Sequence, residues 1–279
     1  MKTYESGWEN KEGIKFHVRG WEPGEKPKAV VALVHGHGEH VGRYVHVAEA
    51  FTEAGYVLTG FDLRGHGKSG GARGHTPSYE ALMDDIADFL AQVIKRYPKL
   101  PLFVYGHSLG GNLVLNFILR RKPKVAGVIV TAPWLKLAFD PPAFQVSLAR
   151  VMNKIAPGYT QNSKLDTTAL SHDAQIVKAY DNDPLVHDKF SARLYLGMYE
   201  SGLWALEHAA EFPVPLLLMH GTGDRLTSVQ ASQEFAGHAG QKVTWRAWEG
   251  WYHEIHNEPQ KAEVMKVMTV WMNARIKKK

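Results

Sequence analysis

The stretch Pro101-Leu102-Phe103-Val104-Tyr105-Gly106-His107-Ser108-Leu109-Gly110-Gly111 decides the fold of this chain. Its first five residues are apolar or aromatic, as in a strand that is buried on both faces. Residues 112–121 then predict a helix. A serine at the tip of so tight a turn needs strained backbone angles, and its neighbours two positions away crowd it, so glycine is required at 106 and 110. The stretch therefore predicts a strand, a sharp turn with a projecting serine, and a helix.

Strand-length apolar segments recur on both sides of this turn and alternate with helical stripes. They are residues 29–34, 56–61, 101–105, 125–131, 215–219 and 243–247. One helix is predicted to begin after Ser78, as its N-cap, and to end before Pro98. Before the first of these strands, period-two alternation after a turn-like segment predicts a hairpin over residues 8–20. Such alternation of strands and helices predicts a mainly parallel sheet with helices on both faces.

Residues 134–202 interrupt this alternation, because they hold no convincing strand. They contain a helical stripe followed by polar, turn-rich sequence; the stripe consists of Phe144, Leu148, Val151, Met152 and Ile155. We interpret residues 134–202 as a helical cap inserted into a core formed by residues 1–133 and 203–279.

The composition of the 279 residues is that of an ordinary globular protein, with 44% hydrophobic and 22% charged residues. The absence of cysteine excludes disulfides, Cys-ligated metals and a thiol nucleophile. The net charge of +5 lies partly in Lys277–Lys279, which we expect to be a solvated tail, and the other charges are interspersed, so no nucleic-acid binding is expected. The N-terminus lacks the apolar stretch of a secretory signal, and no apolar run could cross a bilayer, so we expect a soluble, cytoplasmic protein.

A serine hydroxyl becomes a nucleophile when a base, oriented by an acid, removes its proton. After Ser108, the acid Asp224 and the base His253 each lie just past the end of a predicted strand, where open α/β sheets place their sites. His256 is a rival base, three residues further on. The competing acids lie in the predicted cap and are expected to cap helices or face solvent; they are Asp166, Asp173, Asp181 and Asp183.

The glycine-rich loop from His35 to His40 is predicted to hold the developing oxyanion. The backbone N–H groups of His37 and Leu109 are the expected donors. The histidines of this loop also resemble a metal cluster, but its glycines fit an oxyanion loop without a metal. The segment His253–His256 has its histidines three apart, whereas the zinc-protease motif needs four. We therefore expect no metal and no cofactor.

Taken together, these motifs resemble the serine α/β-hydrolases, and in particular the prokaryotic type of the monoacylglycerol lipase and lysophospholipase-like family. The resemblance rests on the His35–His40 loop, the run Phe61–Ser69, the Gly-X-Ser-X-Gly turn, and the late Asp224 and His253. It implies an eight-stranded, mostly parallel sheet with a helical cap after strand six. It also implies cleavage of monoacylglycerols to fatty acid and glycerol through an acyl-enzyme intermediate.

The resemblance further implies a substrate pocket under the cap. Glu39 and Arg43 would lie near the alcohol side, or would form an ion pair that stabilises the loop. The apolar stripe of residues 144–155 would line the acyl tunnel, touch a membrane surface transiently, or pack within the cap. A lysophospholipase, a broad carboxylesterase, an acyltransferase, a peptidase and a non-catalytic lipid-binding protein are the alternatives.

Overall fold

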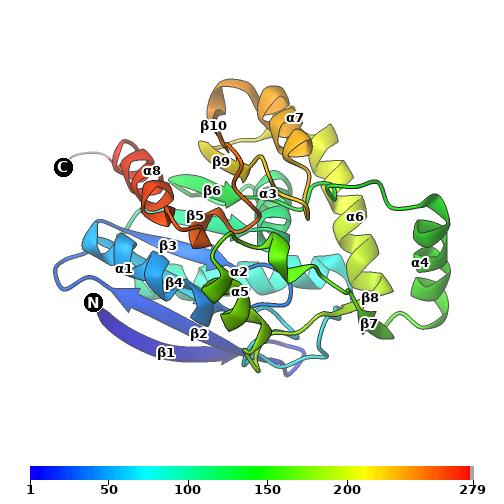
Figure 1. Cartoon of the computed structure of the whole chain (residues 1–279). Helices are drawn as coiled ribbons and strands as arrows, with labels where there is room; N and C mark the ends of the chain where they lie inside the picture. The colour runs from blue at the N-terminus through cyan, green and yellow to red at the C-terminus, as the bar shows by residue number, and fades with distance from the viewer. Residues whose placement is uncertain (277–279) are drawn as a thin grey trace.

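The computed structural model describes residues 1–276, and the predicted solvated tail at 277–279 lies outside the described residues. Its main feature is an eight-stranded sheet with the strand order β1-β2-β4-β3-β5-β6-β9-β10 (Figure 1). Strand β2 runs antiparallel to both neighbours, and all other neighbouring pairs are parallel. The predicted eight-stranded, mostly parallel sheet is confirmed. Its strands are β1 Lys2–Glu9, β2 Lys15–Glu22, β3 Ala29–Val34, β4 Tyr56–Phe61, β5 Leu102–His107, β6 Gly127–Thr131, β9 Leu216–Gly221 and β10 Val243–Trp248.

Eight α-helices accompany the sheet in the described part of the chain. They are α1 Val45–Glu53, α2 Tyr79–Arg96, α3 Leu109–Arg121, α4 Ala143–Ile155, α5 Ala174–Asp181, α6 Ala192–Glu207, α7 Val229–Ala239 and α8 Lys261–Asn273. Short 3-10 turns cover Val41–Tyr44, Thr167–Ala169, Ala209–Glu211, Gly240–Lys242 and Ile255–Asn257. The predicted N-cap at Ser78 is present, since its hydroxyl accepts the Ala81 N–H at 3.0 Å.

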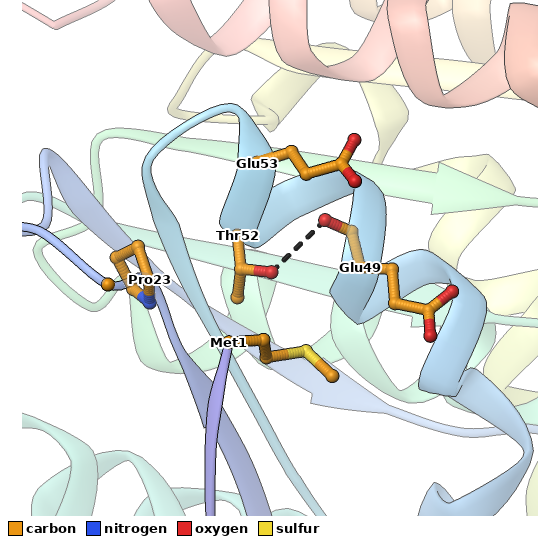
Figure 2. A pocket seen from close by; sticks show the side chains of 6 residues that line it. Met1, Pro23, Glu49, Thr52 and Glu53 are labelled. Carbon is orange, nitrogen blue, oxygen red and sulfur yellow. Dashed lines mark hydrogen bonds between the residues drawn. The ribbon is translucent and has the colours of Figure 1, made fainter.

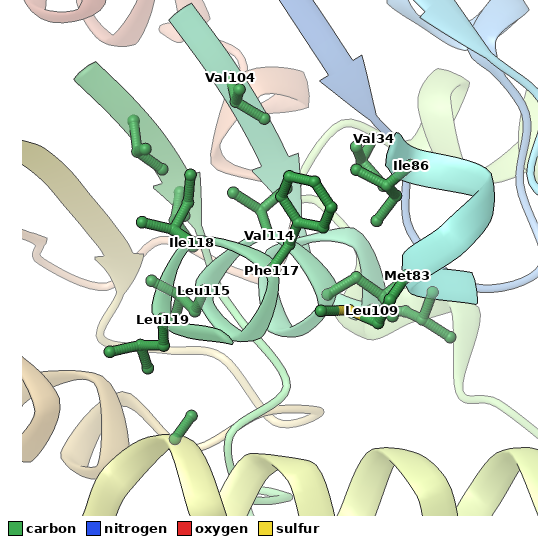
Figure 3. Packing of buried hydrophobic residues seen from close by; sticks show 14 of the residues in the cluster. Val34, Met83, Ile86, Val104, Leu109, Val114, Leu115, Phe117, Ile118 and Leu119 are labelled. Carbon is green, nitrogen blue, oxygen red and sulfur yellow. The ribbon is translucent and has the colours of Figure 1, made fainter. Parts of the chain in front are cut away.

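Two apolar layers hold the helices to the two faces of the sheet. Along β3, Val30, Ala32 and Val34 face a core shared with α2, α3, α6 and α7. The alternate residues of the same strand face a second core shared with α1 and α8. Figure 3 shows the first core around α3, where Val114, Phe117 and their apolar neighbours meet the sheet. Side chains alternate between the faces of a strand, so a strand covered on both sides must be apolar throughout.

The first hairpin is longer than the sequence pattern predicts. Strand β1 begins at Lys2 and pairs with the whole of β2, around a turn at residues 10–14. Most side chains of β1 are exposed or half-buried, and β1 forms the outer edge of the sheet. The alternation that indicates a strand is therefore weak before residue 8, because that segment buries little apolar surface.

The segment 134–202 contains α4, α5 and most of α6, together with two strands that the sequence does not predict. Strands β7 Thr160–Asn162 and β8 Lys189–Ser191 have three residues each, too few for a visible alternation. Helix α6 continues through residue 202 to Glu207, so the predicted boundary falls inside a helix. The segment is hydrogen-bonded to core loops, with His187 N–H donating to the Gly38 carbonyl and Ser191 N–H to that of Gly74, each at 2.9 Å.

A shallow surface hollow of about 230 Å³ lies near the start of the chain. Figure 2 shows its walls, where the Thr52 hydroxyl donates to the Glu49 carbonyl of α1 at 3.1 Å. Met1 and Pro23 form the opposite side (Figure 2). Helix α1 ends just before β4 begins, so this hollow lies at the amino ends of the parallel strands, opposite to the edge that Ser108 occupies.

Candidate active site

Ser108 lies at the tip of the turn between β5 and α3, as the sequence predicts. Its backbone angles are φ 54° and ψ −116°, a strained conformation for a residue other than glycine. A Cβ on Gly106 would lie 2.5 Å from the Gly110 carbonyl oxygen, and one on Gly110 would lie 2.0 Å from the Val34 carbonyl oxygen. The two glycines are therefore required by close backbone packing around the serine.

Asp224 is held by the turn that follows β9. Its Oδ1 atom accepts the backbone N–H groups of Leu226 at 2.7 Å and Thr227 at 3.1 Å. His253 follows β10 on a loop whose backbone is tied to the 134–202 segment, because its N–H donates to the Ala169 carbonyl at 3.3 Å. The sheet thus delivers the acid and the base from neighbouring parallel strands to one edge.

Ser108, His253 and Asp224 form one hydrogen-bonded chain. His253 Nδ1 lies 2.6 Å from Asp224 Oδ2, and His253 Nε2 lies 2.9 Å from Ser108 Oγ. All three side chains are buried, with exposed fractions of 9% or less. Because an ionised carboxylate only accepts hydrogen bonds, His253 carries its proton on Nδ1 and turns the Nε2 lone pair toward the serine hydroxyl.

The charges of Asp224 and His253 stabilise each other. Burial alone would lower the pKa of His253, but the charge and hydrogen bond of Asp224 raise that pKa above its usual value. Burial alone would raise the pKa of Asp224, whereas the charge of His253 and hydrogen bonds from His220 and His253 bring it well below its usual range. The arrangement can thus hold an imidazolium beside a carboxylate, which is what proton removal from a serine requires.

His256 has different surroundings from His253. It lies in the 3-10 turn after His253, with its ring stacked on Tyr44 at 5.1 Å and edge-on to His107 at 4.6 Å between ring centroids. Burial lowers the pKa of His256 to about 3, so the ring is neutral. The structure therefore brings His253, and not His256, into the hydrogen-bonded chain.

The competing acids of the 134–202 segment are not part of the hydrogen-bonded chain that joins Ser108, His253 and Asp224. Asp166 and Asp173 cap a 3-10 turn and α5 by accepting the N–H groups of Thr168 and Gln175. Asp183 accepts a hydrogen bond from His40 at 2.9 Å, and Asp181 is the last residue of α5. Capping accounts for two of these carboxylates, as predicted, while the sequence does not predict the contact with His40.

The glycine-rich loop after β3 lies against Ser108. A Cβ on Gly36 would lie 3.3 Å from the Cβ of Ser108. Leu109 is the first residue of α3, so its N–H belongs to the unpaired amino end of that helix. Among residues 1–276, no protein group accepts the backbone N–H of His37 or Leu109. The two predicted oxyanion donors therefore have no hydrogen-bond partner in the described part of the chain, and their role stays a prediction.

Glu39, which is buried, and Arg43, whose side chain is 10% exposed, belong to an ionic network that the sequence predicts only in part. Glu39 accepts the Gly36 N–H at 2.7 Å and pairs with Arg43 at 2.8 Å. Arg43 also makes two hydrogen bonds to Glu254, at 2.7 and 2.8 Å. Although burial opposes it, the charge of Arg43 lowers the pKa of Glu254, so the Glu254 carboxylate stays ionised. The network joins the glycine-rich loop to the residue that follows His253.

Sequence reasoning missed Glu254, His220 and Thr227. His220 and Thr227 both contact Asp224 Oδ2, at 2.9 and 2.8 Å. The signal for His220 was present, because it begins the segment that carries Asp224, and a residue four positions before a carboxylate can reach it across a turn. Glu254 gave no separate signal, since its partner Arg43 is 211 residues away.

The apolar stripe of α4 is not brought to the serine. Phe144, Leu148, Val151 and Ile155 are between 50% and 75% exposed on the outer face of α4, and Met152 is partly buried. Helix α4 packs on α6 and lies away from the sheet (Figure 1). The expected inward orientation of an apolar helical stripe does not hold here, because α4 has no neighbour on its outer side within the described chain.

Among the described residues, 1–276, no group of three or more His, Cys, Asp or Glu side chains could hold a metal ion. No helix in the same range is both long and apolar enough to cross a membrane.

The sheet order, the serine at the sharp turn after β5 and its hydrogen-bonded partners define the class of α/β-hydrolases. The family model described as serine aminopeptidase, S33 matches residues 25–260, and the chain belongs to this family. The family resemblance found in the sequence is confirmed.

Individual relatives within this family show which of its members the chain is similar to. The chain is 34% identical over 262 residues to a monoacylglycerol lipase of Mycolicibacterium smegmatis, covering 93% of each chain. It is 38% identical to an uncharacterized abhydrolase-domain protein of Dictyostelium discoideum, of which it spans only 28%. The crystal structure of a Paleococcus ferrophilus monoacylglycerol lipase superposes with a TM-score of 0.84 at 33% identity, covering 99% of this chain and 100% of that one. The chain is therefore a hydrolase similar to monoacylglycerol lipases.

Proposed function

We propose that this protein is a serine esterase that hydrolyses monoacylglycerols to a fatty acid and glycerol. The observation that carries the proposal is the hydrogen-bonded chain from Asp224 through His253 to Ser108, with the serine on a strained turn. The substrate class is supported by the similarity to monoacylglycerol lipases over nearly the whole chain.

In the proposed mechanism, the Ser108 hydroxyl attacks the ester carbonyl while His253 Nε2 takes its proton. The carbonyl oxygen becomes an oxyanion held by the N–H groups of His37 and Leu109. The C–O bond to glycerol then breaks, and His253 returns the proton to the leaving alkoxide. A water molecule, deprotonated by the same histidine, attacks the acyl-enzyme and releases the fatty acid, and Ser108 regains its proton.

The ionic network around Arg43 supports this mechanism by holding the glycine-rich loop in place next to the segment that carries His253. Glu39 holds the amino end of the glycine-rich loop through the Gly36 N–H, and Arg43 connects Glu39 to Glu254 beside the catalytic histidine. Because all three charged groups are used in these contacts, we assign Glu39 and Arg43 to loop support rather than to direct recognition of glycerol.

The residues 134–202 act as a cap over the site, and the outer face of α4 docks on a membrane surface. Four large apolar side chains along one stripe of α4 are at least half exposed, and such a patch marks an interaction site. Arg150 and Lys154, both exposed, flank the stripe and suit an anionic lipid surface. Contact with a bilayer would place the cap next to the lipid layer in which monoacylglycerols are dissolved.

The catalytic part of the proposal is tested by fatty-acid release from 1-monooleoylglycerol, measured with the wild type and Ser108→Ala. We expect turnover that disappears in the variant, and a mass increase of one acyl group in the wild type alone when deacylation is trapped. A lysophospholipid and a simple methyl ester serve as comparison substrates. A folded wild type that prefers either of them over monoacylglycerol by kcat/KM would overturn the substrate assignment.

The membrane part is tested by co-sedimentation with vesicles that contain an anionic lipid. We expect the double variant Phe144→Ser/Ile155→Ser to bind at least tenfold more weakly than the wild type, because two exposed apolar anchors are lost. Val270 is 59% exposed on α8 and provides the matched control Val270→Ser. Equal binding by the wild type and the double variant would contradict docking through α4.

A further inference from the structure

His220 is a second histidine that contacts Asp224, beside His253. It is the last residue but one of β9, and its side chain is completely buried. His220 Nε2 lies 2.9 Å from Asp224 Oδ2, the same oxygen that contacts His253 Nδ1 at 2.6 Å. Two imidazole rings thus meet on one carboxylate oxygen.

The contacts of His220 define its orientation and its tautomer. Because the carboxylate can only accept, His220 Nε2 carries a proton and donates it to Asp224. In the neutral ring, His220 Nδ1 is then the acceptor, and it lies 2.8 Å from the hydroxyl of Ser232, which can donate to it. Ser232 is fully buried on α7, so the helix that packs beside β9 holds the ring in place.

This contact divides the negative charge of Asp224 between two histidines. Oδ1 is occupied by the backbone N–H groups of Leu226 and Thr227, which leaves Oδ2 for His253, His220 and the Thr227 hydroxyl. A hydrogen bond from His220 draws charge away from the bond to His253 and opposes rotation of the carboxylate.

We infer that His220 is a positioning residue: through Asp224 it keeps His253 aligned with Ser108 and limits how strongly the carboxylate attracts the proton of His253. This inference rests on the proposed function, in which His253 is the base. The other ionisable groups near His253 are His107 from β5, Glu39 from the glycine-rich loop, and Glu254 and His256, which follow His253 in the chain. None of these side chains is hydrogen-bonded to Asp224.

The inference is tested with His220→Ala, which removes the donor, and His220→Gln, whose amide can replace it. The acidic limb of the kcat/KM profile should move to higher pH by about half a unit in His220→Ala, because the carboxylate then attracts the His253 proton more strongly. The plateau of kcat/KM should fall about tenfold through loss of alignment. His220→Gln should restore both values to near wild type.

His17→Gln is the matched control, because His17 also contacts a buried carboxylate, that of Asp62 at 3.0 Å, but neither residue is hydrogen-bonded to Asp224 or His253. It should leave the acidic limb unchanged even if the melting temperature falls. Ser232→Ala frees the His220 ring and should shift the limb in the same direction as His220→Ala by a smaller amount. It also keeps the inference testable if His220→Ala does not fold.

A readout that needs no turnover separates this inference from the proposed function. The midpoint at which His253 titrates can be followed by NMR of its imidazole nitrogens in the folded wild type and variants. An upward shift of that midpoint in His220→Ala supports the inference even in a protein inactive on the ester tested. An unchanged midpoint in folded His220→Ala, or the same shift in His220→Gln and His17→Gln, would overturn it.

Discussion

Replacing Asp224 by asparagine should leave the site in place but reverse the tautomer of His253. In the wild type, Oδ1 of Asp224 accepts two backbone N–H groups at 2.7 and 3.1 Å. An asparagine keeps these bonds only by placing its carbonyl oxygen there. Its NH₂ group then takes the position of Oδ2, beside His253 Nδ1, where a donor replaces an acceptor.

His253 must then present a lone pair at Nδ1 and carry its proton on Nε2. In that form Nε2, which lies 2.9 Å from the Ser108 hydroxyl, cannot accept the serine proton. We expect kcat to fall about 10⁴-fold, equivalent to roughly 5.5 kcal/mol of transition-state stabilisation. The fold should remain, because no side-chain volume is lost.

The assay is the steady-state rate of ester hydrolysis across pH, together with thermal unfolding of each protein. Asp224 raises the pKa of His253 in the wild type, so kcat/KM should fall as the pH drops through that raised value. The residual activity of Asp224→Asn should have its acidic limb at lower pH, since the anion is gone. A folded variant with kcat within tenfold of wild type would refute the proposed role of Asp224.

Three further predictions concern neighbouring residues. His256→Ala should keep kcat within about tenfold of wild type, whereas His253→Ala should lower kcat by about 10⁵-fold or more. Equal losses of kcat in the ester assay would contradict the proposal that His253 is the base. Gly110→Ala should lower the free energy of unfolding, measured by urea titration, by about 3 kcal/mol or more, because the new Cβ would lie 2.0 Å from a backbone oxygen. Gly237 has open space around it, so the control Gly237→Ala should leave the free energy of unfolding unchanged or raise it. Arg43→Ala should cost about 3–5 kcal/mol near neutral pH by leaving buried carboxylates unpaired. Since Arg43 lowers the pKa of Glu254, this difference should shrink as the pH falls below about 4, and a pH-independent loss would exclude the ionic explanation.

The fold was largely predictable because its signals are local. Six segments stand out in the sequence as apolar runs. Each contains most of one parallel strand of the large sheet, namely β3, β4, β5, β6, β9 or β10. The edge strand β1 and the three-residue strands β7 and β8 were predicted incompletely or not at all. Their residues bury too little apolar surface, or are too few, to leave a period in the sequence.

The orientation of α4 shows where a local rule fails. Its stripe has the spacing of a helix face that normally packs inward, yet Phe144 and Ile155 are 68% and 75% exposed. Spacing identifies which side chains share a face of a helix, but only the placement of the neighbouring helices decides which face is covered.

By itself the sequence predicted a serine at a sharp turn, an acid after one later strand and a histidine base after the next, because each follows a recognisable strand and the chemistry requires these residue types. The choice between His253 and His256, the ionic network of Arg43 and the contact of His220 with Asp224 were decided only by the tertiary structure. The physical reason is distance along the chain. Arg43 and Glu254 are 211 residues apart, and a hydrogen bond of 2.7 Å between them exists only once the sheet has brought their loops to one edge.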